Sequence, residues 1–230
     1  MAEGGRLDFT AALKNGLKAL NIPAPEPAAL ASLQRYFIEL EKWGRKINLV
    51  ARAAPEQIIE NHFLDSLTLL PLIVGQKAHS LLDVGSGAGF PGLALKIACP
   101  ALTTVTLVEP RQKRVSFLRH VIRCLRLDNI KIIEERLREE KEAWPAYGRP
   151  DIITCRALTA IGPFLNMITN CPPHSTIICM KGPRLEKELK DWRHEDPASS
   201  FKHTRTLYFT MPGNKAERAL AVFTKSPSAA

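Results

Sequence analysis

A glycine-rich segment, Asp83–Gly89, constrains the fold of this chain more than any other feature. It follows a short apolar run, precedes a helical pattern, and places glycines at positions 85, 87 and 89. Each of these glycines costs about 1 kcal/mol in backbone entropy relative to alanine, so a purely structural turn rarely carries all of them. Bare backbone can turn sharply after a strand and approach a ligand closely. The segment therefore predicts a ligand-binding strand–loop–helix unit.

The chain from Ser80 onward alternates short apolar runs of strand length with helical patterns, which indicates βαβ units and a parallel sheet. Near the end of the chain, two further runs predict an antiparallel hairpin. The fold class is therefore α/β: a Rossmann-like domain with a mostly parallel sheet and a C-terminal antiparallel hairpin. The expected strands are 81–84, 104–108, 130–133, 151–155 and 176–180, followed by 206–209 and 219–224 in the hairpin.

The first 75 residues have helical periodicity instead. Apolar residues recur at helical spacing from Leu30 to Leu40 and again from Ile59 to Leu70. Prolines at 23, 25 and 27 separate a first helix, near Phe9 to Leu20, from the second. The pattern predicts a small N-terminal helical lobe, residues 1–75, followed by the Rossmann-like domain, residues 76–230.

The chain is basic, with 32 Lys and Arg against 23 Asp and Glu, for a net charge of +9. Such a surface attracts polyanions, and nucleic acid is the natural partner class. Charge alone leaves open a basic protein with no such partner.

Cysteine usage and the N-terminus predict a reduced, cytoplasmic protein. The cysteines are odd in number and include no Cys-x-x-Cys pair, so neither a disulfide framework nor a zinc site is expected, and no other metal is predicted. Met1–Gly5 lacks an apolar signal core. No apolar run approaches the roughly 18 residues of a membrane helix, so no membrane partner is expected.

The loop favours S-adenosylmethionine over a dinucleotide. Gly85, Gly87 and Gly89 would contact the cofactor, and Glu109, at the end of the next strand, would accept hydrogen bonds from the ribose hydroxyls. A dinucleotide fingerprint would place its third glycine where Phe90 stands, and Asp83 suits a cationic sulfonium better than a pyrophosphate. A nicotinamide-dependent oxidoreductase and a glycine turn without a ligand remain open.

Extended to Phe90-Pro91-Gly92, the loop resembles that of the RsmG family, also called glucose-inhibited division protein B. The resemblance covers about Leu40 to Thr224. The further matching motifs, in chain order, are Trp43 with Asn48-Leu49, His62-x-x-Asp65-Ser66, Lys113-Arg114-Val115-x-Phe117-Leu118-Arg119, Cys155-Arg156-Ala157 and Met180-Lys181-Gly182.

The resemblance implies a class I methyltransferase with an N-terminal helical lobe that methylates N7 of one guanine in 16S ribosomal RNA, within the small subunit or its precursor. By position, Gly85 and Phe90 match family cofactor contacts, Leu137 and Arg138 fall where the family brackets the adenine, and Arg156 matches an arginine on the cofactor and substrate side. Relatives often have glutamate where this chain has Arg138, which puts a side-chain contact there in doubt.

Guanine N7 attacks through an in-plane lone pair and loses no proton, so no catalytic base is expected. Arg156 is the candidate for positioning the base, by pairing with O6 or stacking. A covalent thiolate from Cys155 would instead indicate pyrimidine C5 methylation, but a buried strand-end cysteine is the commoner arrangement. A non-catalytic RNA-binding protein also stays open.

Substrate-binding candidates lie on three segments. His62 and Asp65, at i and i+3, could form a hydrogen-bonded pair at the junction of lobe and domain. Lys113 and Arg114, at the start of a basic crossover helix, could contact RNA phosphates, and Lys181 follows the fifth strand.

Overall fold

A computed structural model of the chain describes residues 7–226. Met1–Gly5, on which the localisation prediction partly depends, lies outside these residues.

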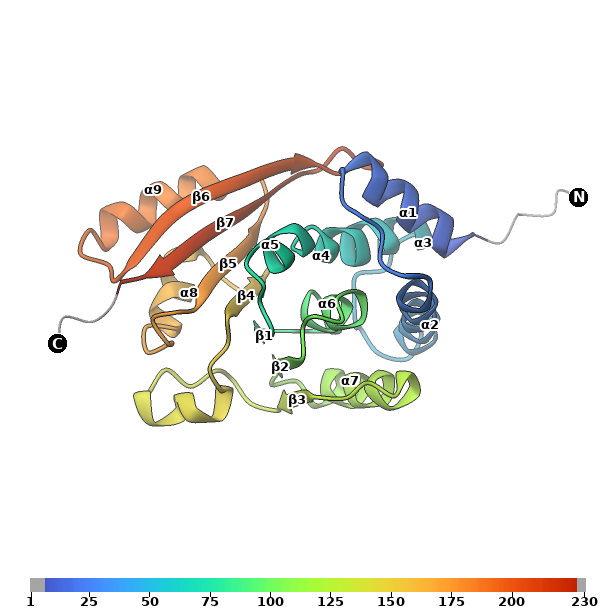
Figure 1. The fold of residues 1–230 in the computed structure, drawn as a ribbon, viewed down its shortest axis with the longest axis horizontal. Helices are drawn as coiled ribbons and strands as arrows, with labels where there is room; N and C mark the ends of the chain where they lie inside the picture. Colours follow the sequence, from blue (N-terminus) through green and yellow to red (C-terminus); the bar gives the residue numbers. More distant parts are fainter. Residues whose placement is uncertain (1–6, 227–230) are drawn as a thin grey trace, which may run out of the picture.

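A single seven-stranded sheet, in the order β3-β2-β1-β4-β5-β7-β6, forms the centre of the molecule (Figure 1). The first five strands run parallel, and β7 pairs antiparallel with both β5 and β6. The predicted fold class, with its C-terminal antiparallel hairpin, is confirmed. The strands are β1 Ser80–Val84, β2 Thr104–Val108, β3 Ile130–Ile133, β4 Ile152–Arg156, β5 Thr176–Lys181, β6 Phe201–Thr210 and β7 Glu217–Lys225.

The predicted strand positions match the observed ones closely, except for β6. This strand begins at Phe201, not at residue 206. Its first half, Lys202–Arg205, is polar because β6 is the edge strand and is exposed along most of its length. A bulge between His203 and Arg205 further disturbs the alternation on which a strand prediction relies.

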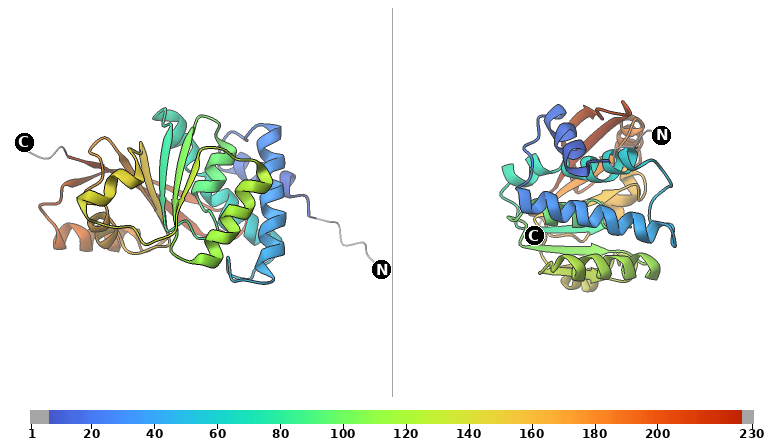
Figure 2. Two further views of the ribbon diagram at one scale, coloured as in Figure 1. Left: turned by 90° about the horizontal axis from the view of Figure 1, so that it is seen from below. Right: turned by 90° about the vertical axis from the view of Figure 1, so that its right-hand side faces the viewer.

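Helices cover both faces of the sheet (Figure 2). Alternate strand residues separate the two buried layers: Leu81 packs with one helix set and Leu82 with the other. The first layer contains α6 Gly92–Ala98 and α7 Gln112–Leu125, the predicted crossover helix. The second contains the 3₁₀ helix η2 Lys141–Tyr147 with α8 Ile161–Met167 and α9 Leu185–Glu195.

The N-terminal helices pack outside α6 and α7. They are α1 Phe9–Ala19, α2 Pro27–Gly44, and a run made of α3 Pro55–Ile58, the π-helix η1 Ile59–Leu64, α4 Asp65–Leu67 and α5 Leu70–Gly75. One continuous buried cluster joins Phe9 and Leu33 in these helices to Leu93 and Phe117 in α6 and α7. The division at residue 75 therefore stays a prediction about chain organisation, because the two parts share a core.

The helical run Pro55–Gly75, 21 residues long, is apolar enough by composition to cross a membrane. From the sequence we expected no apolar run of about this length, so this segment was missed. However, 67% of the most apolar 18 residues of this run is buried inside the protein, where the run packs against α1 and α6. Its apolar character is therefore accounted for by a core helix.

Candidate active site at the carboxyl ends of the parallel strands

The glycine loop joins β1 to α6 and takes a backbone conformation that favours glycine. Gly85, Gly87 and Gly89 have φ angles of 78°, 59° and 101°. The amides of Gly85 and Ser86 donate to the carbonyl of Val108 at 2.9 and 3.0 Å, which ties the loop to the end of β2. The loop is thus held at the carboxyl edge of the sheet, where open α/β sheets bind ligands.

Two glycines of the loop face opposite surroundings. A Cβ added at Gly89 would lie 2.6 Å from Tyr36 Oη and 3.0 Å from Leu118 Cδ2, so this glycine permits close packing. A Cβ added at Gly87 would meet nothing closer than Arg114 Nη1 at 3.6 Å, an ordinary van der Waals contact, and this glycine is partly exposed. Of the two, Gly87 offers the bare surface that a cofactor can approach.

Helix α2 supports the loop from the N-terminal side. The buried hydroxyl of Tyr36 donates a hydrogen bond to Ala88 O, and its ring stacks on Phe90 with centroids 5.2 Å apart. Phe90 is only 3% exposed. Sequence reasoning did not identify Tyr36, since it lies within an apolar helical stripe and resembles any core aromatic residue.

Glu109 lies where it was predicted, beyond the end of β2 and 2% exposed. Its Oε2 accepts from the amide of Gly87 at 2.9 Å and its Oε1 from the amide of Arg111 at 2.9 Å. The guanidinium of Arg114 lies 3.6 Å from Oε2. Glu109 therefore places a fixed negative charge beside the open face of the loop.

Asp83 adds a second acidic group beneath the loop. It is fully buried, and its Oδ2 accepts from the amide of Gly92 at 2.8 Å. Within residues 7–226, no hydrogen bond to Oδ1 is found. Burial raises the pKa of Asp83 to about 7. Glu109, with a partly ionised Asp83 beneath the loop, fits a cationic sulfonium cofactor better than a pyrophosphate.

We predict that Glu109→Ala weakens cofactor binding by about 1–3 kcal/mol, because a charged hydrogen-bond partner is lost and the Gly87 amide is released. Calorimetric titration of S-adenosylmethionine measures the change. Glu109→Gln, which keeps a carbonyl acceptor, is the matched control and should lose less. Unchanged affinity in Glu109→Ala would limit Glu109 to capping the start of α7.

The predicted adenine-bracketing pair follows β3. Leu137 is buried with Val108 and Tyr147. The backbone amide of Arg138 already donates to Tyr147 Oη at 2.8 Å, so it is engaged within the protein. The Arg138 guanidinium pairs with Glu135 at 3.2 Å. The assignment of Leu137 and Arg138 to the adenine stays a prediction.

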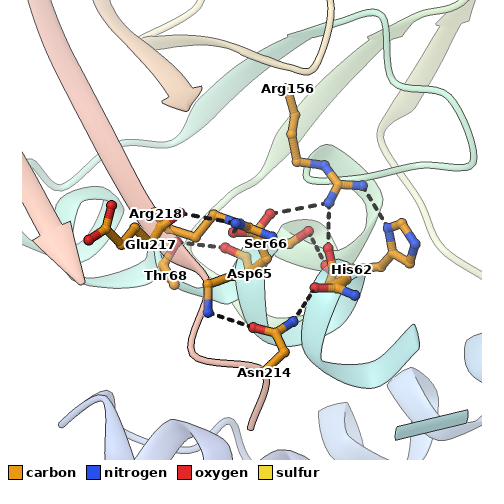
Figure 3. A network of polar contacts seen from close by, with 10 residues as sticks. His62, Asp65, Ser66, Thr68, Arg156, Asn214, Glu217 and Arg218 are labelled. Carbon is orange, nitrogen blue, oxygen red and sulfur yellow. Dashed lines mark hydrogen bonds and ion pairs between the residues drawn. The ribbon is translucent and has the colours of Figure 1, made fainter. Parts of the chain in front are cut away.

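Arg156, at the end of β4, is the centre of a polar network that joins the sheet to the N-terminal helices (Figure 3). Its Nη1 donates to Asn61 O at 2.7 Å and to Asp65 Oδ2 at 3.2 Å, and its Nη2 contacts His62 Nδ1 at 3.0 Å. The guanidinium also lies over the ring of Phe90, 5.4 Å from its centroid. Arg156 is therefore held in place between the glycine loop and the helical run.

The π-helical turn η1 creates one of these contacts. The Asp65 amide donates to Glu60 O, five residues back, and also to His62 O. The carbonyl of Asn61, four residues back, is thereby free to accept from Arg156. A π-helical turn often marks a functional site, and here it turns a backbone carbonyl toward a strand-end guanidinium.

The spacing of His62 and Asp65 had suggested a hydrogen bond between them, but the two side chains do not bond to each other. Both contact Arg156 instead, and Asp65 Oδ1 also lies 3.5 Å from Arg218 Nε on β7. The sequence gives no signal for Arg218, because its partner is 153 residues away and on another element. Burial and the adjacent guanidinium of Arg156 lower the pKa of His62 to about 3.

A cavity of about 770 Å³ opens beside this network, at the carboxyl ends of β4 and β5. His62, Arg156 and Lys181 line it, so the fold brings these predicted residues together. The Lys181 ammonium is engaged within the protein, donating to Thr159 O at 2.6 Å and pairing with Glu188 at 2.7 Å. Lys113 is exposed on α7 beyond this cavity.

Cys155 is 1% exposed on β4. Burial and the neighbouring Cys179 thiol raise the pKa of Cys155, which disfavours a nucleophilic thiolate. The five cysteines are all free thiols in this structure.

Comparison with known proteins identifies the family. The model described as rRNA small subunit methyltransferase G, GidB, matches residues 29–218. The chain belongs to this family. Ribosomal RNA small subunit methyltransferase G of Desulfotalea psychrophila is 42% identical over 219 residues, covering 94% of this chain and 98% of that protein. Its counterpart in Myxococcus xanthus is 35% identical over 219 residues, covering 94% and 97%.

Membership of the methyltransferase G family confirms the resemblance found in the motifs and makes the chain a methyltransferase that uses S-adenosylmethionine. It also decides against a nicotinamide-dependent oxidoreductase. Among solved structures, an O-methyltransferase from Bacillus cereus in complex with SAH matches with a TM-score of 0.59 at 16% identity, covering 94% of this chain and 98% of that one. This likeness confirms the methyltransferase fold.

Proposed function

We propose that this protein transfers the methyl group of S-adenosylmethionine to N7 of one guanine in 16S ribosomal RNA, in the small subunit or its precursor, in the cytoplasm. Family membership supports an RNA substrate of the small subunit. The assignment of N7 is carried by the chemistry of the cavity beside the glycine loop.

Among the described residues that line the cavity, none is suited to remove a proton from a substrate, since the acceptor nitrogen of His62 is already engaged by Arg156 and the acids are paired or exposed. Asp65 is paired with Arg156 and Arg218, and Glu188 is paired with Lys181. The remaining lining acid, Asp191, is exposed on α9. N7 of guanine needs no base: its lone pair forms the new N–C bond while the C–S electron pair passes to sulfur, and no proton moves.

The protein then has two tasks, which are to align the base with the methyl group and to keep water away. The rate comes from proximity and electrostatics. Arg156 suits the first task because three contacts from the helical run fix its guanidinium at the edge of the cavity. S-adenosylmethionine, bound along the open face of the loop at Gly87, supplies the methyl group.

The charge of the cavity rim favours an RNA substrate. Arg184 and Lys187 are exposed at the start of α9, line the cavity, and have no ion-pair partner among the described residues. Together with the net charge of +9, they can contact phosphates around the target nucleotide.

The decisive experiment is to incubate the protein with labelled S-adenosylmethionine and small ribosomal subunits that lack their native methylation. Any methylated nucleotide is then mapped, and its modified atom is identified by mass spectrometry. We expect a single 7-methylguanine in 16S RNA. A methyl group on a pyrimidine carbon or an exocyclic amine would contradict the proposal.

A further inference from the structure

We propose that His62 reads O6 of the target guanine by donating a hydrogen bond from its Nε2–H, and so helps the enzyme to select guanine over adenine. This inference rests on the proposed function, since it concerns the base that is methylated. It assigns a specificity role to a histidine that the methyl transfer itself does not require.

The tautomer of His62 is set by Arg156. A guanidinium has only donors, so the ring nitrogen that it contacts, Nδ1 at 3.0 Å from Nη2, must be the acceptor. A neutral imidazole with an unprotonated Nδ1 carries its hydrogen on Nε2. His62 therefore presents a single donor, on the side of the ring away from Arg156 (Figure 3).

That donor lies at the border between the glycine loop and the cavity. The His62 ring packs against Phe90, with centroids 5.2 Å apart, and His62 lines the cavity together with Arg156. Within residues 7–226, no hydrogen bond to Nε2 is found, whereas Nδ1 is engaged. A half-buried donor in the wall of the cavity, beside Phe90 of the glycine loop, is thus available to a ligand.

The backbone segment that carries His62 is held in place from two further sides. Ser66 Oγ donates to His62 O at 2.5 Å, at the end of the π-helical turn. The turn between β6 and β7 binds Glu60 and Asn61, the two residues before His62. The amide of Asn214 donates to Glu60 Oε2 at 3.0 Å, and the Asn214 side chain donates to Asn61 Oδ1 at 2.8 Å. With its backbone tied in this way, and its ring bound to Arg156 and packed on Phe90, the donor is oriented well enough to discriminate between acceptors.

The chemistry of the Hoogsteen edge selects guanine. O6 of guanine is an acceptor next to N7, whereas adenine has the N6 amino donor at that place. Adenine would set two donors against each other and leave both unpaired. Because methylation at N7 makes the base a cation, a neutral donor also serves better than a charged imidazolium. The lowered pKa of His62, about 3, keeps the ring neutral at physiological pH.

The test compares guanine with 2-aminopurine, which keeps N7 but lacks O6, at the target position. RNA with either base is prepared by ligation of a synthetic fragment, assembled into small subunits, and methylated under single-turnover conditions. The two bases differ in intrinsic reactivity, but this difference is the same for every enzyme variant. The informative quantity is therefore the guanine to 2-aminopurine rate ratio of each variant relative to wild type.

We expect His62→Leu, which removes the donor, to lower this ratio by roughly tenfold, the effect of one good base contact. His62→Gln, whose amide nitrogen can occupy the place of Nε2, should retain most of the ratio. Cofactor affinity, measured by calorimetry, should change little in both variants, because the inference concerns the base and not the cofactor.

Several outcomes would overturn the inference. One is an unchanged ratio in His62→Leu, with both RNAs slowed equally, which would make His62 a support for Arg156 only. If His62→Leu does not fold, a folded His62→Gln that loses the ratio would overturn it as well. A wild-type enzyme that methylates no guanine N7 would overturn the proposed function itself, and with it this inference.

Discussion

Replacing Arg156 by alanine is expected to slow methyl transfer by at least about a hundredfold, the cost of a small misplacement of a reacting group. The guanidinium joins Asn61 O, Asp65 and His62 at the edge of the cavity, so its loss releases the groups that surround the target base. Single-turnover methylation of small subunits measures the effect.

The change also removes one of the two cationic partners of Asp65, a carboxylate only 4% exposed, and leaves Arg218 alone, 3.5 Å away, to balance its charge. Weakening the pairing of a buried charge can destabilise the fold. The double variant Arg156→Ala/Asp65→Asn removes that charge and serves as the folding control. We expect it to recover stability in thermal unfolding without recovering activity. Recovery of both would mean that Arg156 acts through the fold alone.

The neighbouring residue separates two mechanisms. Cys155→Ser should retain most of the activity, because the buried thiol has a raised pKa and N7 attack needs no thiolate. An inactive Cys155→Ser enzyme beside an active Arg156→Ala enzyme would contradict the positioning mechanism and indicate methylation at pyrimidine C5.

The sheet could be predicted from the sequence because its parallel strands are buried on both faces. Strands such as Leu81–Val84 and Thr104–Val108 are short apolar runs between helical patterns, and these patterns do not depend on distant residues. The glycine loop was recognisable for a related reason, since its glycines, Asp83 and Glu109 are fixed by local chain geometry and by one βαβ unit.

The partners of Arg156 could not be predicted in this way. They lie 91 to 95 residues earlier in the chain, and Asn61 contributes a backbone carbonyl, which has no sequence signature. The π-helical turn that frees this carbonyl is equally hidden, because Ile59, Phe63 and Leu67 keep an ordinary helical spacing through it. His62 and Asp65 were singled out, but their spacing indicated a pair, and only the packing of the helical run against β4 shows the arginine between them.

The same packing explains why the N-terminal helices matter to the site. Tyr36 on α2 holds the glycine loop, the π-helical turn holds Arg156, and the turn between β6 and β7 holds the π-helical turn through Glu60. Since the helices and the sheet share one buried cluster, a change in the lobe is expected to reach the cofactor loop through packed side chains. The lobe therefore completes the site and does not merely accompany the domain.

Gly87 and Gly89 are two residues apart in the sequence but have different surroundings, and together they give the sharpest test of the loop. Gly89→Ala is expected to lower the free energy of unfolding by about 3 kcal/mol, since it combines a left-handed backbone with overpacking. The added Cβ would lie 2.6 Å from Tyr36 Oη and 2.9 Å from Leu93 Cβ, and φ at this position is 101°. Chemical denaturation measures the loss.

Gly87→Ala is the matched variant, with the opposite balance of effects. At φ 59° and with no atom within 3.5 Å of the added Cβ, it should cost only about 1 kcal/mol of stability. The same methyl group would project from the open face of the loop, so we expect the dissociation constant for S-adenosylmethionine to rise at least about tenfold, or 1.4 kcal/mol. Calorimetry on the folded variant decides the matter. If Gly87→Ala binds the cofactor as tightly as wild type, the cofactor does not bind at this face of the loop. If Gly89→Ala is as stable as wild type, α2 does not pack against the loop as closely as its contacts imply.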